Sequence, residues 1–251
     1  MKIITDTDFF KGATTFLFDL DATLGPYRQS DLSKAYFEGI ENYAASRCDG
    51  ARFNDAAMKA FEAMKKNDGT QSNRLTFAQT FDSLYPDFPG NIIEFYEEYY
   101  NSPEFNSIGE KVTYYRGSEK GLLKNLRAKG YKAVCATNPV FPMSANRVRM
   151  GWAGLDVEDF DFVTVFDDYS YCKPSPGYFL QAAAAAGSTP AECIMVGNDT
   201  LDDLEADRTG MRVLLITDYM KDRGNRDLAG VSVCAYEELL RLCSALPDIG
   251  R

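Results

Sequence analysis

Short runs of apolar residues alternate with segments of helical periodicity along the second half of the chain. The runs are rich in β-forming residues, which is typical of strands buried on both faces of a sheet. Helical patterns occupy 118–129, 175–187 and 201–209 between them. This alternation predicts an α/β fold with a doubly wound, mostly parallel sheet and helices on both faces. The predicted strands are 14–20, 131–136, 162–166, 193–196 and 213–216, with a weaker one at 231–234.

The segment between the first two predicted strands breaks the alternation. Residues 28–108 are helical in pattern and unusually aromatic, with helices expected at 30–48, 53–66, 76–84 and 91–100. Gly25-Pro26 precedes this insert, and 107–117 follows it. We therefore predict a helical cap domain at 27–108, inserted into a Rossmann-like core domain formed by 1–26 and 109–251. Most of its aromatic residues are expected to pack inside the cap.

Charge and cysteine content limit the partners and the location. The chain has 37 acidic and 27 basic residues and a net charge of −10, which disfavours binding to nucleic acid or an anionic membrane surface. The first residues lack a secretory pattern, and no apolar stretch approaches the roughly 20 residues of a membrane span. The six cysteines form no CxxC pair. Reduced thiols and a cytoplasmic location are expected.

Histidine is absent from the chain. Its absence excludes Ser-His-Asp and Cys-His catalysis in their usual forms, and zinc sites built on imidazole. Any chemistry must therefore depend on carboxylates, hydroxyls, lysines and a hard cation.

Polar residues follow the predicted strands at the points where the chain leaves the sheet. The first strand ends in a DxDxT sequence that begins at Asp19, and ligands of open α/β sheets bind at this edge. Each polar residue also has an ordinary interpretation, as a turn residue, a solvated cation or the acidic first turn of a helix. Their common position at strand ends favours one shared site. The set comprises Asp19, Asp21, Thr137, Asn138, Lys173, Asp199, Asp202 and Asp203.

From residue 14 to about 216, the chain resembles the haloacid dehalogenase-like (HAD) superfamily. That family has a DxDGT or DxDxT motif, a later Ser or Thr, a Lys, and an acidic cluster after a GD or GND turn. The resemblance implies that Asp19 is the nucleophile and Asp21 the acid/base. It also implies that Lys173 orients and neutralises the nucleophile and phosphate, while Thr137 and Asn138 bind phosphoryl oxygens.

The same resemblance implies a Mg²⁺ site formed by Asp19, Asp21, Asp199 and Asp203, a donor set that suits a hard cation. The sequence 197–199 reads Gly-Asn-Asp, so Asn198 is an alternative to Asp199. The cap position matches family members with an α-helical cap. Position 22 is Ala where the family most often has Gly, and Ala adopts a positive φ less readily.

Asp21 distinguishes between reactions within this resemblance. Family members that cleave carbon–halogen or carbon–phosphorus bonds typically lack a carboxylate at this position. We therefore expect a Mg²⁺-dependent phosphohydrolase that acts on a small phosphorylated metabolite through an aspartyl-phosphate intermediate. A phosphomutase of the same superfamily and a non-catalytic phospholigand-binding protein are the alternatives. A non-catalytic member is expected to lose Asp19 or Asp21, and both are present.

Overall fold

The computed structural model describes residues 1–113, 117–223 and 226–250. Within these residues, a seven-stranded sheet has the order β1-β7-β6-β5-β2-β3-β4, and all of its pairs are parallel. This arrangement confirms the predicted α/β fold. The strands are β1 (Lys2–Ile3), β2 (Thr15–Phe18), β3 (Lys132–Cys135), β4 (Phe162–Val163), β5 (Cys193–Gly197), β6 (Arg212–Ile216) and β7 (Ser232–Cys234).

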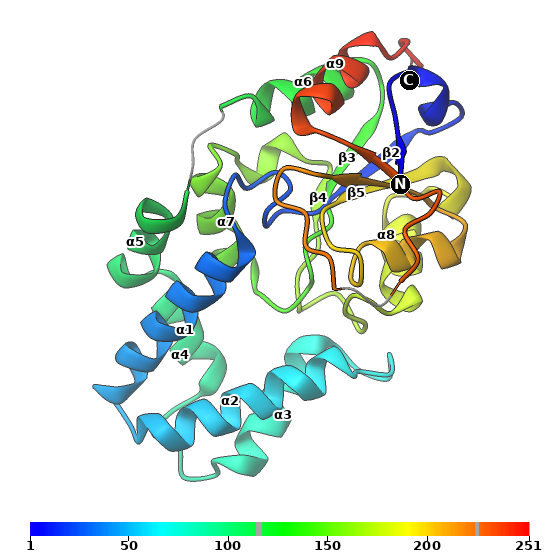
Figure 1. The fold of residues 1–251 in the computed structure, drawn as a ribbon. Helices are drawn as coiled ribbons and strands as arrows, with labels where there is room; N and C mark the ends of the chain where they lie inside the picture. Colours follow the sequence, from blue (N-terminus) through cyan, green and yellow to red (C-terminus); the bar gives the residue numbers. More distant parts are fainter. Residues whose placement is uncertain (114–116, 224–225, 251) are drawn as a thin grey trace.

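Helices cover both faces of this sheet (Figure 1). On one face, α6 (Glu119–Ala128), α7 (Met143–Trp152) and α9 (Tyr236–Ala245) pack against alternate strand residues such as Phe16 and Phe18. On the other face, α8 (Pro176–Ala185) packs against Leu17 and its neighbours. Because side chains alternate across a strand, inner strands such as β2 contribute to both apolar layers.

Two predicted elements are shorter than expected. The strand predicted at 162–166 is β4, which contains Phe162 and Val163. The helix predicted at 201–209 is a 3₁₀ helix over Leu204–Thr209. In the preceding turn, the Asp199 carboxylate accepts hydrogen bonds from the backbone N–H groups of Leu201 and Asp202. These bonds satisfy donors that an α-helix starting at residue 201 would leave open.

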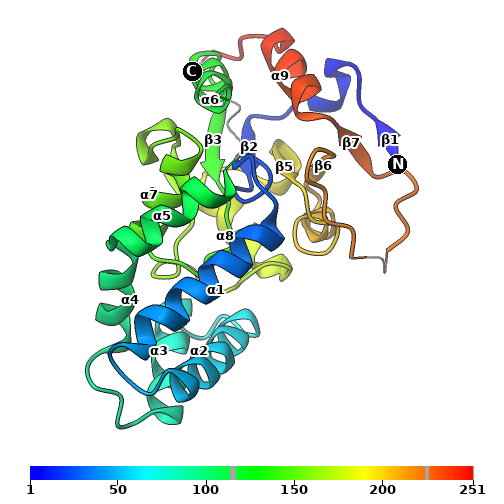
Figure 2. The same ribbon diagram turned by 60° about the vertical axis from the view of Figure 1, so that its left-hand side comes forward.

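The cap consists of α1 (Gln29–Ala45), α2 (Gly50–Lys65), α3 (Asn73–Leu84), α4 (Ile92–Tyr100) and α5 (Pro103–Val112). Figure 2 shows these helices grouped beside the sheet. The helix α5 runs past the predicted boundary at residue 108, and Gly109 lies inside it. A Cβ atom at Gly109 would lie 2.2 Å from Trp152 Cδ1 of α7, so glycine permits close helix packing here. Of the predicted linker 107–117, residues 114–116 lie outside the described residues.

The cap is joined to the core by packing as well as by its chain connections. One apolar cluster contains cap residues such as Tyr36 and Phe105 together with Ala145 and Phe166 of the core. At the start of α3, the Asn73 side chain is buried and donates to the Pro139 carbonyl at 3.1 Å. The cap aromatics therefore pack inside the cap as predicted, and they also extend its interior into the core. Among the described residues, no helix is both long and apolar enough to cross a membrane.

Candidate functional site

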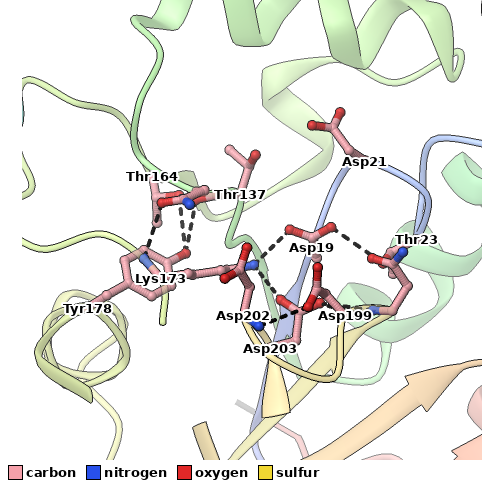
Figure 3. Close-up of polar contacts among 12 residues, drawn as sticks. Asp19, Asp21, Thr23, Thr137, Thr164, Lys173, Tyr178, Asp199, Asp202 and Asp203 are labelled. Carbon is pink, nitrogen blue, oxygen red and sulfur yellow. Dashed lines mark hydrogen bonds and ion pairs between the residues drawn. The ribbon is translucent and has the colours of Figure 1, made fainter. Parts of the chain in front are cut away.

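The first candidate residue, Asp19, directly follows β2. Its backbone N–H donates to the Val196 carbonyl of β5 at 2.8 Å, which extends the strand pairing by one residue. One carboxylate oxygen, Oδ1, accepts a hydrogen bond from Lys173 Nζ at 2.7 Å. The same Nζ lies 2.7 Å from Asp203 Oδ1 (Figure 3). Residues separated by up to 184 positions thus meet at the carboxyl ends of the strands.

Burial makes this cluster electrostatically unbalanced. Burial raises the pKa of Asp19 to about 7, Lys173 opposes the rise, and the nearby carboxylates of Asp203 and Asp21 add to it. Burial also disfavours the charge of Lys173, but Asp19 and Asp203 raise its pKa well above the usual value. Lys173 therefore stays protonated between two carboxylates. Its single positive charge does not balance the negative charges of the carboxylates around Asp19.

The second aspartate, Asp21, is held on both of its oxygens. Oδ1 accepts a hydrogen bond from the Tyr27 hydroxyl at 2.7 Å, and Oδ2 lies 2.5 Å from Arg149 Nη2. Arg149 is only 2% exposed, and its Nη1 donates to Asn146 one turn earlier in α7. Burial and Asp21 together raise the pKa of Tyr27 well above its usual value, so the phenol remains a neutral donor.

The turn that carries Asp21 has an unusual backbone conformation. Gly25 N donates to the Leu20 carbonyl at 2.6 Å, which closes the turn after β2. Within it, Ala22 has a φ of 63°, in the left-handed region that favours glycine. The turn therefore does require a positive φ at position 22, and alanine adopts it.

Thr137 and Asn138 follow β3 as predicted and border the same site. Thr137 is buried, and its hydroxyl accepts a hydrogen bond from Arg149 Nη2 at 3.1 Å. The Thr137 carbonyl accepts hydrogen bonds from the hydroxyls of Thr164 and Tyr178, and these bonds hold the loop after β3 in place. Asn138 Oδ1 accepts a bond from the backbone N–H of Lys173 at 3.2 Å. This bond links the predicted phosphate-binding loop after β3 directly to the predicted lysine motif.

The acidic cluster after β5 is extensively hydrogen-bonded. Asp203 Oδ2 accepts from the backbone N–H groups of Asn198 and Asp199 at 2.9 and 3.0 Å. Asp199 Oδ2 lies 2.7 Å from Arg223 Nη2 and 3.7 Å from Lys221 Nζ. Arg223 also pairs with Asp202 at 2.9 Å. These carboxylates therefore shape the loop and already have cationic or backbone partners.

The arrangement provides a limited set of oxygens for a metal ion. Among the described residues, no three acidic or cysteine side chains converge in a way that could hold a metal. Asp19 Oδ2 and Asn198 Oδ1, however, both face the Thr23 hydroxyl, at 3.5 and 3.3 Å. Two convergent oxygens beside a buried carboxylate that is short of positive charge fit one hard cation, with water and substrate as its other ligands.

These groups border a cavity of about 390 Å³ between the core and the cap, within the range of small-molecule sites. The cap side is mainly apolar and is formed by α1, α2 and Phe105 of α5. The core side is polar and contributes Asp19, Asp21, Thr137, Asn138, Arg149 and Lys173. Apart from Arg149, these residues were predicted from the sequence, and the structure brings them to one cavity with Asn198, Asp199, Asp202 and Asp203.

Sequence reasoning missed Arg149, Tyr27 and Arg223. An arginine in the run NRVRM looks like a solvent-exposed helix residue, and α7 itself was not predicted. Tyr27 follows Gly25-Pro26, which indicated only a linker. The buried ion pair between Arg149 and Asp21 joins residues 128 positions apart, so no local pattern could reveal it.

The chain is similar in sequence to known phosphatases and pyrophosphatases. The chain is 24% identical over 164 residues to a bifunctional riboflavin kinase/FMN phosphatase of Arabidopsis thaliana, covering 62% of this chain and 41% of that protein. The chain thus spans less than half the length of that relative. Identity to the pyrophosphatase PpaX of Bacillus cereus (strain AH820) is 23% over 211 residues, covering 83% of this chain and 85% of that protein.

Solved structures share the fold. A HAD phosphatase from Thermococcus onnurineus aligns with a TM-score of 0.55 and 21% identity, covering 94% of this chain and 100% of that one. The L-2-haloacid dehalogenase of Xanthobacter autotrophicus aligns with a TM-score of 0.54 and 14% identity, covering 93% and 99%. The family description "haloacid dehalogenase-like hydrolase" matches residues 13–206, most of the chain. The chain belongs to the haloacid dehalogenase-like hydrolases.

Proposed function

We propose that the protein is a Mg²⁺-dependent phosphohydrolase that cleaves a small phosphorylated metabolite through an aspartyl-phosphate intermediate. The observation that carries this proposal is the pairing of Asp19 with Lys173 at 2.7 Å, at a strand end where Asp21 stands two residues away. A buried carboxylate beside a protonated lysine can act as a nucleophile toward a phosphorus atom whose oxygens need neutralising. The relatives named as phosphatases and pyrophosphatases support the same reaction class.

In the first step, an Asp19 oxygen attacks phosphorus and the bond to the leaving oxygen breaks. Asp21 in its acid form gives a proton to that oxygen. Lys173 and the Thr137 and Asn138 side chains bind the oxygens of the transferred group. In the second step, water attacks the phosphorus, Asp21 takes up its proton, and the phosphorus–Asp19 bond breaks. The two steps restore both carboxyl groups and release an alcohol and inorganic phosphate.

Tyr27 and Arg149 have a positioning role in this scheme. Arg149 holds one oxygen of Asp21 from α7 of the core, and Tyr27 holds the other from the segment between β2 and α1. A carboxylate offers about four acceptor sites, so Asp21 can accept these two bonds and still receive a proton from water. Its orientation is therefore set by one core helix and by the segment that leads into the cap.

We place the cation at Asp19 and Asn198. When bound, Mg²⁺ would neutralise the nucleophile and the phosphoryl oxygens. Asp21, Asp199 and Asp203 were also predicted as ligands. The oxygens of Asp21 are engaged by Tyr27 and Arg149, and those of Asp199 and Asp203 by Arg223, Lys173 and backbone N–H groups. We propose that Asp199 and Asp203 shape the loop that presents Asn198. The cytoplasmic location and the domain boundaries remain predictions of the sequence.

The first test of the function is turnover of p-nitrophenyl phosphate. We expect hydrolysis with Mg²⁺, its loss in excess EDTA, and its return when Mg²⁺ is restored. Ca²⁺ should support it poorly, because its larger and looser shell disturbs the in-line geometry. Asp19→Asn, purified in parallel, controls for contaminating phosphatases. Full activity in excess chelator would contradict the metal assignment, and equal activity of Asp19→Asn would contradict the nucleophile.

A further inference from the structure

The lining of the cavity that contains Asp19 includes exposed apolar side chains. Phe37 of α1 is 44% exposed, Met58 of α2 is 46% exposed, and Leu201 of the acidic loop is 40% exposed. All three line the cavity. Exposing large apolar groups to water is unfavourable, and their convergence on one site indicates that a ligand covers them.

Further open space lies beside this cavity on the cap side. A second cavity of about 260 Å³ lies between α1 and α2, and it shares Tyr36, Phe37, Met58 and Phe61 with the first. Ile40 and Ala57 extend its apolar wall, while Glu41 and Asn54 provide its polar lining. We call this second cavity the α1–α2 groove. Because four residues line both spaces, the groove adjoins the cavity that contains Asp19.

The lysine and arginine side chains that line the first cavity near the cap are already paired. Lys65 lies 3.1 Å from Glu62. On the core side of the opening, Lys221 donates to Gln29 Oε1 at 3.2 Å, and Arg223 is bound by Asp199 and Asp202. The described lining of the α1–α2 groove includes no lysine or arginine. A second phosphate or a sugar rich in hydroxyls would find few partners there, whereas an apolar chain would replace water on apolar walls.

We propose that the substrate is a phosphate monoester of an elongated apolar alcohol, such as an alkyl or isoprenoid phosphate, with its chain lying in the α1–α2 groove. This proposal rests on the proposed phosphohydrolase function and adds the chemical class of the leaving group. The phosphate is held at Asp19 and Lys173, and the chain passes Phe37 and Met58 into the groove.

The test is a series of n-alkyl monophosphates from ethyl to octyl, assayed with Mg²⁺. We expect kcat/KM to rise about two- to fourfold per methylene until the groove is filled, as burial of a CH₂ group predicts. Phe37→Ser and Met58→Ser should flatten this dependence. Both positions are exposed, so little loss of stability is expected. Leu84→Ser is the matched control, because Leu84 is an exposed cap residue (38%) that is not among the lining residues of either cavity.

The outcomes separate this inference from the function itself. Turnover of ethyl and aryl phosphates with no dependence on chain length would overturn the apolar-substrate proposal and leave the phosphohydrolase intact. Faster turnover of pyrophosphate than of every alkyl ester would do the same. No Mg²⁺-dependent turnover of any phosphate would overturn the function first. Light scattering would show whether Phe37→Ser changes the oligomeric state. If it does, and the chain-length dependence stays intact, the exposed residues Phe37 and Met58 belong to a subunit interface, and the proposal is overturned.

Discussion

Arg149 Nη2 lies 2.5 Å from Asp21 Oδ2, so a buried guanidinium from α7 holds the carboxylate proposed as the acid/base. Because Tyr27 holds the other oxygen, the side chain is fixed from two directions. Substitutions of Tyr27 and Arg149 should therefore affect kcat and stability more than substrate binding.

Tyr27→Phe removes one donor to Asp21 and buries no new charge. We expect kcat on an alkyl phosphate to fall about tenfold, because the acid/base loses part of its orientation. KM should change by less than about twofold, since Tyr27 is not among the residues that line the cavity. Steady-state kinetics would check this. An unchanged kcat would show that the Tyr27 hydroxyl does not position Asp21.

Arg149→Met breaks a buried ion pair by removing one partner. We expect the free energy of unfolding to fall by about 3–5 kcal/mol, because the Asp21 carboxylate, only partly exposed, loses its cation. Urea unfolding measures this change. Arg149→Lys should recover part of the stability, and a loss below about 1 kcal/mol for Arg149→Met would contradict the structural role of the pair.

Most of the strands and the positions of the strand-end residues could be predicted because they depend on local patterns, whereas the strand order, with β2 between β5 and β3, was not predicted. An apolar run that ends in Asp19 indicates a buried strand and a polar edge without knowledge of the partners. The role of Arg149 could not be predicted, because its burial depends on the packing of α7 against β2 and the cap. The choice between Asn198 and Asp199 likewise depends on Arg223, which pairs with Asp199 in space and not in sequence.

The metal assignment predicts different effects at adjacent positions. Asn198→Ala should weaken Mg²⁺ binding about tenfold or more, because it removes one of the two proposed protein oxygens. Asp199→Asn should change it much less. The shift of the thermal unfolding midpoint with Mg²⁺ concentration reports binding without an activity assay. A larger loss of Mg²⁺ response for Asp199→Asn would favour the original prediction from the sequence.

The raised pKa of Asp19 predicts a pH-dependent stability. Its folded pKa of about 7 lies above the ordinary value of 3.8, so the folded state holds the proton more tightly between these values. Stability conferred by this group therefore falls as pH rises from about 4 to 7. In EDTA at pH 8, Asp19→Asn should unfold at a higher urea concentration than the native protein. The difference between the two urea midpoints should be smaller at pH 5. A difference that does not change with pH would contradict the raised pKa of Asp19.

The backbone at position 22 gives a test of the turn. For Ala22→Gly, relief of an unfavourable φ opposes the loss of a buried methyl group and the greater freedom of the unfolded chain. We expect a net change below about 1 kcal/mol. Ala22→Val should cost more than about 2 kcal/mol, because a β-branched residue is strongly disfavoured at positive φ. Thermal unfolding of both variants measures this, and tolerance of valine would exclude the observed turn.

The central claim is that Asp19 becomes phosphorylated. The most direct measurement is rapid acid quenching of Asp21→Asn during turnover of p-nitrophenyl phosphate, followed by peptide mass spectrometry. With this good leaving group, the variant should still form the acyl phosphate and hydrolyse it slowly, so one phosphoryl group should accumulate on the peptide that contains Asp19. The double variant Asp19→Asn/Asp21→Asn should show none. Continued turnover without any phosphorylated Asp19 peptide, or the same modification in the double variant, would contradict the account.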